Sequence, residues 1–188
     1  LEDVPTDKKQ IAVTRSFGSP VTTLEPLLEA VSEFASRAAE KLRKQGSFAG
    51  QLYVFAHSSP FRPPPQFSRG VVVPLRRPTA DTSILVQAAR AGVRRIYEDG
   101  YQLQKAGVIL LDLASFTLHQ GELDLEDSEP EDQSHLMTTI DRLNRRYGRG
   151  TVFVGGTGVG TERAWGARQM RLTPQYTTRL EDIPVARA

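Results

Sequence analysis

The sequence predicts an α+β fold: a four-stranded sheet with two helices on one face, followed by a small C-terminal appendage of a helix and a strand. Three observations predict it. The periodic segments follow the order β-α-β-β-α-β, the two helical segments are long enough to cover one sheet face, and the connections are short. The other sheet face, or an edge, is therefore left for a partner.

The first two segments have the clearest periods. Residues 11–17 alternate apolar and polar side chains, as a half-buried strand does. Thr22 and Glu25 have the spacing of a capping box, and Gly46 is expected to end the helix that follows. The apolar stripe of this helix, which indicates one face on a core, consists of Leu27, Val31, Phe34, Ala35, Ala38 and Leu42.

Two further β-rich runs follow, over residues 51–56 and 70–75. The three prolines at residues 63–65 separate them, because a proline run continues neither a helix nor a strand ladder. Pro74 has no N–H for a ladder, so the third strand is expected to lie at a sheet edge or to carry a bulge.

A second helix and a fourth strand complete the predicted sheet. The helix is expected to begin at Asp81 or Thr82 and to end at Gly100. Residues 105–113 form a mostly apolar strand. The residues of the helix that are expected to face the core are Leu85, Ala88, Ala89, Val93 and Ile96.

The C-terminal part has a different character. Residues 117–133 are acidic and poor in core-forming side chains, which predicts a flexible connector. A helix is expected over 134–147, and a short strand over 151–154. The predicted units are therefore a domain over 1–116, the connector over 117–133 and a small domain over 134–188. The helix carries its apolar side chains on one side, at Leu136, Ile140, Leu143 and Tyr147.

Charge divides the chain in a similar way. Residues 1–118 carry 15 Lys and Arg against 11 Asp and Glu, residues 119–134 carry 7 acids and no base, and residues 135–188 carry 9 Arg against 4 acids. Basic units of this kind suit a polyanionic partner, although for the first unit alone, solvation of helix faces explains the excess equally well.

Composition sets further limits. The absence of cysteine excludes disulfides and thiolate metal sites and fits a reducing cytoplasm. The longest apolar runs, such as residues 108–111, are far shorter than the roughly 20 residues that cross a bilayer, so no membrane partner is expected. Leu1 in place of Met predicts that the sequence begins inside a longer protein, the alternative being a processed N-terminus.

Basic and hydroxyl side chains gather at the ends of the predicted strands. Guanidinium, ammonium and hydroxyl groups contact phosphates without reading bases, so they predict binding to a nucleic-acid backbone. The alternative for each arginine taken singly is a solvated surface charge. The candidate DNA-binding residues are Arg15, Ser16, Ser58, Ser68, Arg69, Arg76, Arg77 and Lys105.

The connector contains a candidate docking motif. Gln120, Leu123 and Leu125 resemble the linear motif that bacterial DNA polymerases insert into the sliding clamp. Such a motif needs an amide at the pocket rim and apolar side chains that fill the pocket. Gly121 stands where leucine is frequent, and the terminal aromatic residue is absent, so weakened binding is expected. The alternative is a chance match in a solvated linker.

The sequence gives little support for nucleotide binding, metal binding or catalysis. The glycine-rich run over residues 155–160 lacks the third glycine of a dinucleotide fingerprint and the lysine of a phosphate loop, so it is interpreted as a flexible loop. His57, His119 and His135 have no ligand spacing, and no carboxylate pair suits two-metal chemistry. We expect no metal site, no cofactor and no catalytic residue in this chain.

The motifs together resemble the C-terminal portion of UmuC-type (DNA polymerase V, ImpB/MucB/SamB) Y-family translesion DNA polymerases. The resemblance covers essentially the whole chain. The segments that carry it are residues 15–18, 38–43, 59–61 and 104–108, then Trp165, Met170, Pro174, residues 176–179 and residues 182–184.

The resemblance implies a little-finger domain, of β-α-β-β-α-β order, that holds template-primer DNA beside an active site during SOS lesion bypass. It implies that the catalytic carboxylates and their Mg lie upstream, in a bacterial, cytoplasmic, nucleoid-associated protein. The implied partners are the sliding clamp, a UmuD'-like dimer and the RecA filament. Two alternatives stay open: a protein-interaction module with negligible DNA affinity, and a nucleotide-dependent enzyme built on the glycine-rich run.

Overall fold

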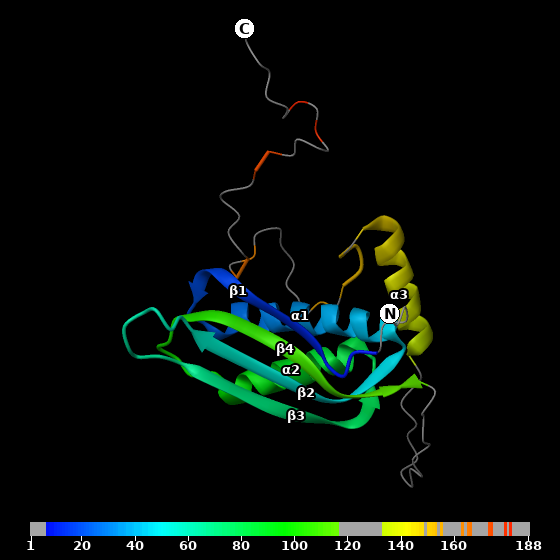
Figure 1. Cartoon of the computed structure of the whole chain (residues 1–188), viewed down its shortest axis with the longest axis horizontal. Coiled ribbons are helices and arrows are strands. Elements are labelled where there is room, and N and C mark those ends of the chain that lie inside the picture. The colour runs from blue at the N-terminus through cyan, green and yellow to red at the C-terminus, as the bar shows by residue number, and fades with distance from the viewer. Residues whose placement is uncertain are drawn as a thin grey trace, which may run out of the picture.

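The chain folds into one sheet with helices on one of its faces (Figure 1). The computed structural model describes residues 7–116, 133–148, 150–153, 155, 163, 165–166, 173–174, 179 and 181. The elements are β1 (Ile11–Val21), α1 (Leu24–Gln45), β2 (Ser47–Ser58), β3 (Ser68–Thr79), α2 (Thr82–Ile96), β4 (Leu103–Ser115) and α3 (Ser134–Tyr147). The predicted α+β fold and its β-α-β-β-α-β order are confirmed.

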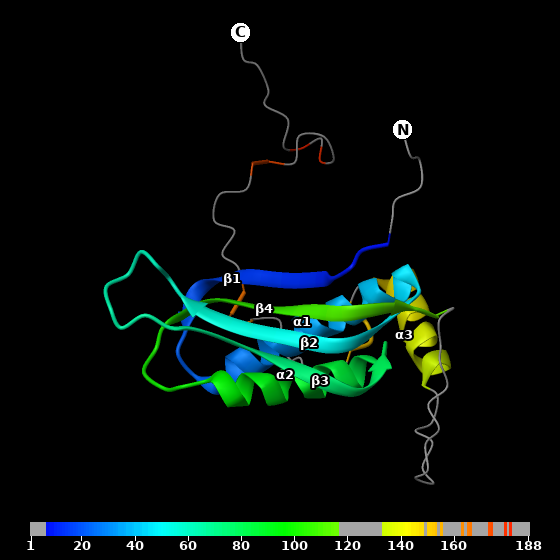
Figure 2. The ribbon, with the colours of Figure 1, turned by 60° about the horizontal axis from the view of Figure 1, so that its bottom comes forward.

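The sheet has the strand order β1-β4-β2-β3, and every neighbouring pair is antiparallel. β1 and β3 are therefore the edge strands. Pro74 lies on β3, and the pairing of β2 with β3 is irregular between Ala49 and Gln51, so the strand is both an edge and irregular, as Pro74 predicts. α1 and α2 lie on the same side of the sheet, and no other described helix or strand covers the opposite face, which we call the open face (Figures 1 and 2).

α1 forms from a long apolar stripe, and ten of its side chains, including Phe34, are buried. It ends at Gly46, whose φ of 73° is the left-handed conformation that glycine adopts easily. The predicted capping box does not form, because the helix begins after Thr23 rather than Thr22, and Thr23 makes no side-chain cap. This start puts Pro26 at the third helical position, where it has no N–H for a capping side chain.

α2 begins as predicted and ends early. The Asp81 carboxylate accepts hydrogen bonds from the backbone N–H groups of Ser83, at 2.6 Å, and Ile84, at 3.2 Å. The helix stops at Ile96 rather than Gly100, because Tyr97 takes an extended backbone conformation. The Tyr97 hydroxyl lies 3.0 Å from the Thr22 carbonyl oxygen, a tertiary contact that no local pattern indicates.

The core lies between the sheet and the two helices. Alternate side chains of each strand face the helices, and the largest fully buried ones come from both layers. The fully buried side chains include Val31, Phe34, Leu42, Leu52, Val54, Leu85, Val93, Val108 and Leu110.

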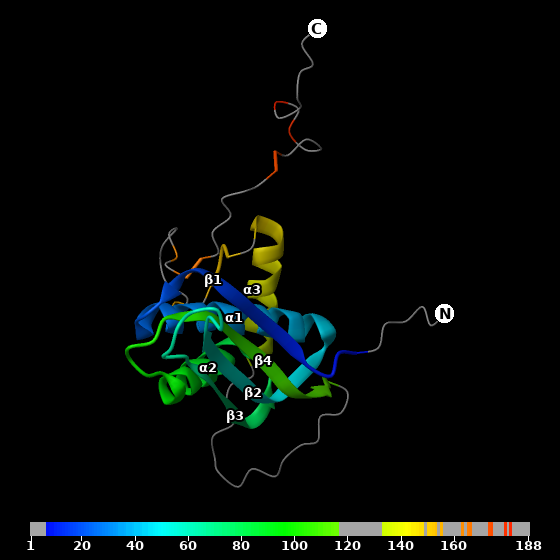
Figure 3. The ribbon, with the colours of Figure 1, turned by 60° about the vertical axis from the view of Figure 1, so that its left-hand side comes forward.

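The C-terminal part packs on the helix layer, where α3 lies beside α1 (Figures 1 and 3). Trp165 is 4% exposed and belongs to the core cluster, with its ring 5.6 Å from the Phe34 ring in an edge-to-face arrangement. The backbone N–H of Gly18 also donates to the Gly166 carbonyl at 3.1 Å. Trp165 therefore contributes to the same core as the sheet.

The apolar side of α3 is only partly buried. Met137 is its buried residue, and Ile140 and Leu143 are half-buried, whereas Leu136 is 50% exposed and Tyr147 62% exposed.

The short strand expected over 151–154 needs correction: Thr151 and Val152 form a bend, Phe153 has no regular secondary structure, and Val154 lies outside the described residues. The Asn144 side chain takes the backbone groups of Val152 that a strand ladder would use: its Nδ2 donates to the Val152 carbonyl at 2.8 Å, and its Oδ1 accepts from the Val152 N–H at 2.9 Å.

β4 leads toward the connector at the end of the sheet. It ends at Ser115, and the N–H of Phe116 donates to the Gly46 carbonyl at 3.0 Å. Lys105, near the start of the same strand, lies at the opposite end of the sheet. Within the described ranges, no helix has the length and apolarity that crossing a bilayer requires.

Candidate nucleic-acid interface

The open face of the sheet is built by strand alternation. On β2, Leu52, Val54 and Ala56 are buried toward the helices, so Tyr53 and His57 lie on the opposite face. The antiparallel register then places one residue from each neighbouring strand beside each of these positions. The open face is therefore a set of transverse rows that can be assigned residue by residue.

One of these rows consists entirely of hydrogen-bonding side chains. Ser16 on β1 pairs with Lys105 on β4, Lys105 pairs with His57 on β2, and His57 pairs with Ser68 on β3. The His57 Nδ1 atom lies 2.9 Å from the Ser68 hydroxyl oxygen. We call these four residues the polar row. A hydroxyl, an ammonium, an imidazole and a second hydroxyl thus cross the whole width of the sheet.

The surroundings of the row favour the neutral form of His57. Burial first, and then the nearby Lys105 ammonium, lower the pKa of the imidazole below its ordinary value of 6.5. The neutral ring has one N–H donor and one acceptor nitrogen. The Nδ1 atom faces the Ser68 hydroxyl, so that hydroxyl and the ring share one hydrogen bond whose direction depends on the tautomer.

The next row along the strands contains two glycines. Thr14, Gly107, Phe55 and Gly70 follow one another across the four strands. A methyl group at Gly107 would lie 2.5 Å from the Thr14 Cγ2 atom and 2.7 Å from the Phe55 ring, closer than atoms can pack. The glycines therefore make room for the aromatic rings of β2.

Those rings form a continuous stack along β2. The Tyr53 and Phe55 ring centroids are 5.7 Å apart with planes at 27°, and those of Phe55 and His57 are 4.8 Å apart with planes at 34°. Tyr53 extends over Gly70, where an added methyl group would lie 2.2 Å from its hydroxyl oxygen. We call Tyr53, Phe55 and His57 the aromatic stack.

Three of the predicted DNA-binding residues meet in the polar row: Ser16, Ser68 and Lys105. Arg15 and Arg69 do not share their face. Arg15 pairs with Ala106 and Arg69 with Ala56, and both alanines are buried toward the helices.

Arg15 and Arg69 therefore stand at the two edges of the sheet, on the helix side of the strands that carry Ser16 and Ser68. Arg69 is also occupied within the protein. It forms an ion pair with Glu98, and its guanidinium carbon lies 5.3 Å from the centre of the Phe67 ring. Of the two arginines, Arg69 is thus the one with an acidic partner described.

The other predicted residues lie elsewhere. Arg76 and Arg77 are on β3 beyond Pro74, toward the opposite end of the strand from Ser68. The Ser58 hydroxyl accepts a hydrogen bond of 2.8 Å from the backbone N–H of Phe67 and so closes the end of the strand pair. The candidate clamp-binding residues Gln120, Leu123 and Leu125 and the glycine-rich residues 156–160 lie outside the described residues.

Sequence reasoning missed His57 as a member of this interface, because it treated the three histidines only as possible metal ligands. A signal was present. His57 has the same strand parity as Tyr53 and Phe55, so alternation alone places it on one face with them. Within the described ranges, no group of three or more histidine or acidic residues is placed to hold a metal ion.

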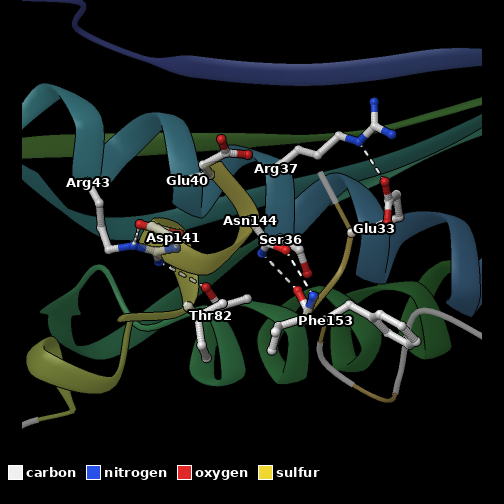
Figure 4. A pocket seen from close by; sticks show the side chains of 12 residues that line it. Glu33, Ser36, Arg37, Glu40, Arg43, Thr82, Asp141, Asn144 and Phe153 are labelled. Carbon is white, nitrogen blue, oxygen red and sulfur yellow. Dashed lines mark hydrogen bonds and ion pairs between the residues drawn. The ribbon is translucent and has the colours of Figure 1, made fainter. Parts of the chain in front are cut away.

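A cavity of about 110 Å³ lies on the other side of the molecule, between α1 and α3 (Figure 4). Charged side chains that pair with one another line it. The Arg37 Nε atom lies 2.6 Å from the Glu33 carboxylate, and Arg43 makes an ion pair with Asp141. This cavity is the seam where the C-terminal helix docks.

Comparison with known proteins gives two matches along the chain. Residues 8–123 match the impB/mucB/samB family C-terminal domain, and residues 134–186 match a domain of unknown function, DUF4113. The chain is similar to protein ImpB of Salmonella typhimurium, with 36% identity over 188 residues, which is 100% of this chain and 44% of that protein. It is also similar to protein UmuC of Salmonella typhimurium strain LT2, with 35% identity over 97% of this chain and 43% of that protein.

The chain therefore spans less than half the length of these relatives. Among solved structures, the insertion ternary complex of Dbh DNA polymerase matches with a TM-score of 0.46 and 11% identity, over 56% of this chain and 29% of that one. The first family match alone covers more than half of the 188 residues and includes every strand of the sheet. On this match, the chain belongs to the impB/mucB/samB family.

Proposed function

We propose that this chain is the DNA-binding C-terminal region of a UmuC-type Y-family translesion polymerase, and that its open sheet face holds the phosphate backbone of template-primer DNA. The observation that carries the proposal is the polar row. Ser16, Lys105, His57 and Ser68 place hydrogen-bonding groups side by side on four adjacent strands. A nucleic-acid backbone offers a series of anionic acceptors that such a row complements.

The surroundings of the row support this proposal. Arg15 lies at the β1 edge of the sheet, next in sequence to Ser16, so positive charge borders that end of the row, whereas the charge of Arg69 at the β3 edge is paired with Glu98. Phosphate contacts carry no base information. A polymerase that has to pass damaged bases needs this kind of grip, since base readout would fail at a lesion.

Charge removal tests the proposal. Lys105→Ala is expected to weaken binding of the 188-residue chain to a labelled primer-template by about fivefold to tenfold, and to reduce the slope of log affinity against log salt by about 1. Lys41→Ala is the matched control, because it removes the same charge from the exposed side of α1. Fluorescence anisotropy with two primer-templates of unrelated sequence measures both effects.

The results separate the alternatives. Equal losses for both DNA sequences support a backbone grip, whereas a loss confined to one sequence contradicts it. If Lys41→Ala weakens binding as much as Lys105→Ala, the open face is not the interface. If the wild-type chain has no measurable DNA affinity but binds a sliding clamp, the chain is an interaction module instead.

Family membership supports the remaining proposed functions. We propose that nucleotidyl transfer and its Mg belong to the part of the relatives that precedes this segment, and that the parent acts in SOS mutagenesis in the bacterial cytoplasm. A UmuD'-like dimer and the RecA filament are further proposed partners, without assigned residues.

Clamp tethering is assigned to Gln120, Leu123 and Leu125. Clamp pull-down with the double variant Leu123→Ala and Leu125→Ala tests it. The variant is expected to lose capture while DNA affinity stays unchanged. Capture that persists at the wild-type level would remove the motif from the proposal.

A further inference from the structure

The polar row occupies only one end of the open face. The aromatic stack extends from it along β2, and the side chains beside Tyr53 are apolar: Ala12 and Ile109 on one side and Val72 on the other. These apolar side chains offer no charge and no hydrogen bond to a phosphate. A ligand that covers the whole face must therefore offer both anionic groups and flat apolar groups.

The geometry of the stack makes it a platform rather than a ridge. Phe55 is 7% exposed although it lies on the open face, because Tyr53 and His57 stack on either side of it. Tyr53 reaches over Gly70 and Phe55 over Gly107, at positions where any side chain would collide with the rings. The rings consequently lie low on the sheet, with Tyr53 and His57 half-buried at the two ends of the stack.

The charges around the platform select the type of ligand. The side chains of the polar row, the glycine row and the Tyr53 row include no Asp or Glu, whereas they include Lys105. An anionic polymer is therefore favoured over an apolar protein segment, which has no need for the ammonium. In a duplex the base faces are stacked on one another, while an unpaired strand exposes its base faces beside its phosphates.

We propose that Tyr53 and His57 stack against unpaired bases of a single strand whose phosphates lie on the polar row. Tyr53 and His57 are four residues apart on β2, which is about 13 Å at the rise of an extended strand, so at least two consecutive nucleotides are needed to reach both rows. The platform would hold the unpaired template next to the duplex. This inference rests on the proposed DNA-binding function, which it extends from the duplex backbone to the single strand.

The experiment compares three DNA ligands of equal length: oligo(dT), the same strand with abasic sites, and a blunt duplex. Tyr53→Ala is expected to weaken oligo(dT) binding about tenfold while changing abasic-strand and duplex binding by less than twofold. Tyr53→Phe keeps the ring and should bind oligo(dT) like the wild type. Tyr53→Leu keeps apolar volume without a ring, and it should behave like Tyr53→Ala.

A strand labelled with 2-aminopurine supplies a second readout. Stacking on the platform is expected to quench its fluorescence in the wild-type chain and in Tyr53→Phe, and not in Tyr53→Leu. Thermal unfolding of each variant shows that the sheet is intact. If Tyr53→Leu binds and quenches like the wild type, the stacking proposal is wrong.

Failure of this inference is distinguishable from failure of the proposed function. If Lys105→Ala weakens every DNA ligand while Tyr53→Ala weakens none, the backbone grip stands and the platform does not bind bases. Equal loss of oligo(dT) and abasic-strand binding in Tyr53→Ala would likewise overturn base stacking. If Lys105→Ala changes no DNA affinity, the proposed function itself fails.

Discussion

Asp141 on α3 accepts hydrogen bonds from two nitrogens of the Arg43 guanidinium on α1, each 2.7 Å long. The same guanidinium donates to the Ala80 carbonyl at 2.7 Å and to the Thr82 hydroxyl at 2.9 Å. One side chain therefore joins α1, the start of α2 and α3 (Figure 4). The C-terminal helix is fixed to the body by a polar contact with defined geometry.

Loss of this contact is expected to release α3. Asp141→Ala removes the acceptor of a partly buried guanidinium, which should lower the free energy of unfolding by about 2 kcal/mol. Urea denaturation measures the change, and hydrogen exchange should show faster exchange in α3. Arg145→Ala, at an exposed position of the same helix, is the control and should have little effect. Unchanged exchange in α3 would show that Arg43 does not hold the helix.

Trp165 is expected to stabilise the body. Trp165→Ala removes a ring that is 4% exposed and packed against Phe34, so a loss of about 3 to 5 kcal/mol is expected. Tyr147→Ala, which removes an aromatic side chain that is 62% exposed, provides the comparison. Both are measured by chemical denaturation with circular dichroism. If Trp165→Ala leaves the transition of the sheet unchanged, residues 134–188 fold independently, as the predicted domain boundaries imply.

Gly107 is expected to tolerate no side chain. Gly107→Ala would place a methyl group 2.5 Å from Thr14 Cγ2 and 2.7 Å from the Phe55 ring, and the resulting overpacking should cost about 1 to 3 kcal/mol. Thr14→Ser removes the closer methyl group, so the double variant should recover part of the loss. Gly155→Ala is the control, since no atom lies within 4 Å of an added methyl group there. A Gly107→Ala melting temperature equal to that of the wild type would contradict the described packing.

His57 is expected to make stability depend on pH. Its pKa in the folded chain is lowered by burial and by Lys105, so the unfolded chain binds the proton more readily. The contribution of His57 is complete above pH 6.5 and is lost as the pH falls through the lowered pKa. Urea denaturation at pH 7.5 and pH 5 should show a smaller decline for His57→Gln than for the wild type. Equal declines would mean that other groups dominate.

Much of the fold is predictable because its helices are strongly periodic. The stripe of α1 specifies a buried face, and Gly46 and Asp81 mark helix ends through their own backbone and side-chain chemistry. The early end of α2 was not predicted: Tyr97 takes an extended backbone conformation there, and its hydroxyl contacts both Asp99 nearby and Thr22, far away in the sequence. The exposure of Leu136 and Tyr147 on α3 could not be predicted either, since the contacts of α3 with the body include the ion pair of Asp141 with Arg43, which is far away in the sequence.

The candidate site was predictable only as a set of residue types. Adjacent residues of a strand point to opposite faces of the sheet. Arg15 and Ser16 must therefore lie on different faces, and so must Ser68 and Arg69. Which of them meet Lys105 depends on the register between strands that are far apart in sequence. This register cannot be inferred from the pattern of residues within a single strand. The role of His57 was hidden for the same reason.

The direction of β4 also determines from which end of the sheet a proposed sliding-clamp attachment would start. Lys105 is near the start of the strand and Ser115 at its end, a separation of at most about 34 Å at the rise of an extended chain. That span is close to one turn of double helix. A partner captured through the residues that follow Phe116 would be attached from the end of β4 opposite to Lys105, so the attachment and the lysine start from different ends of the sheet.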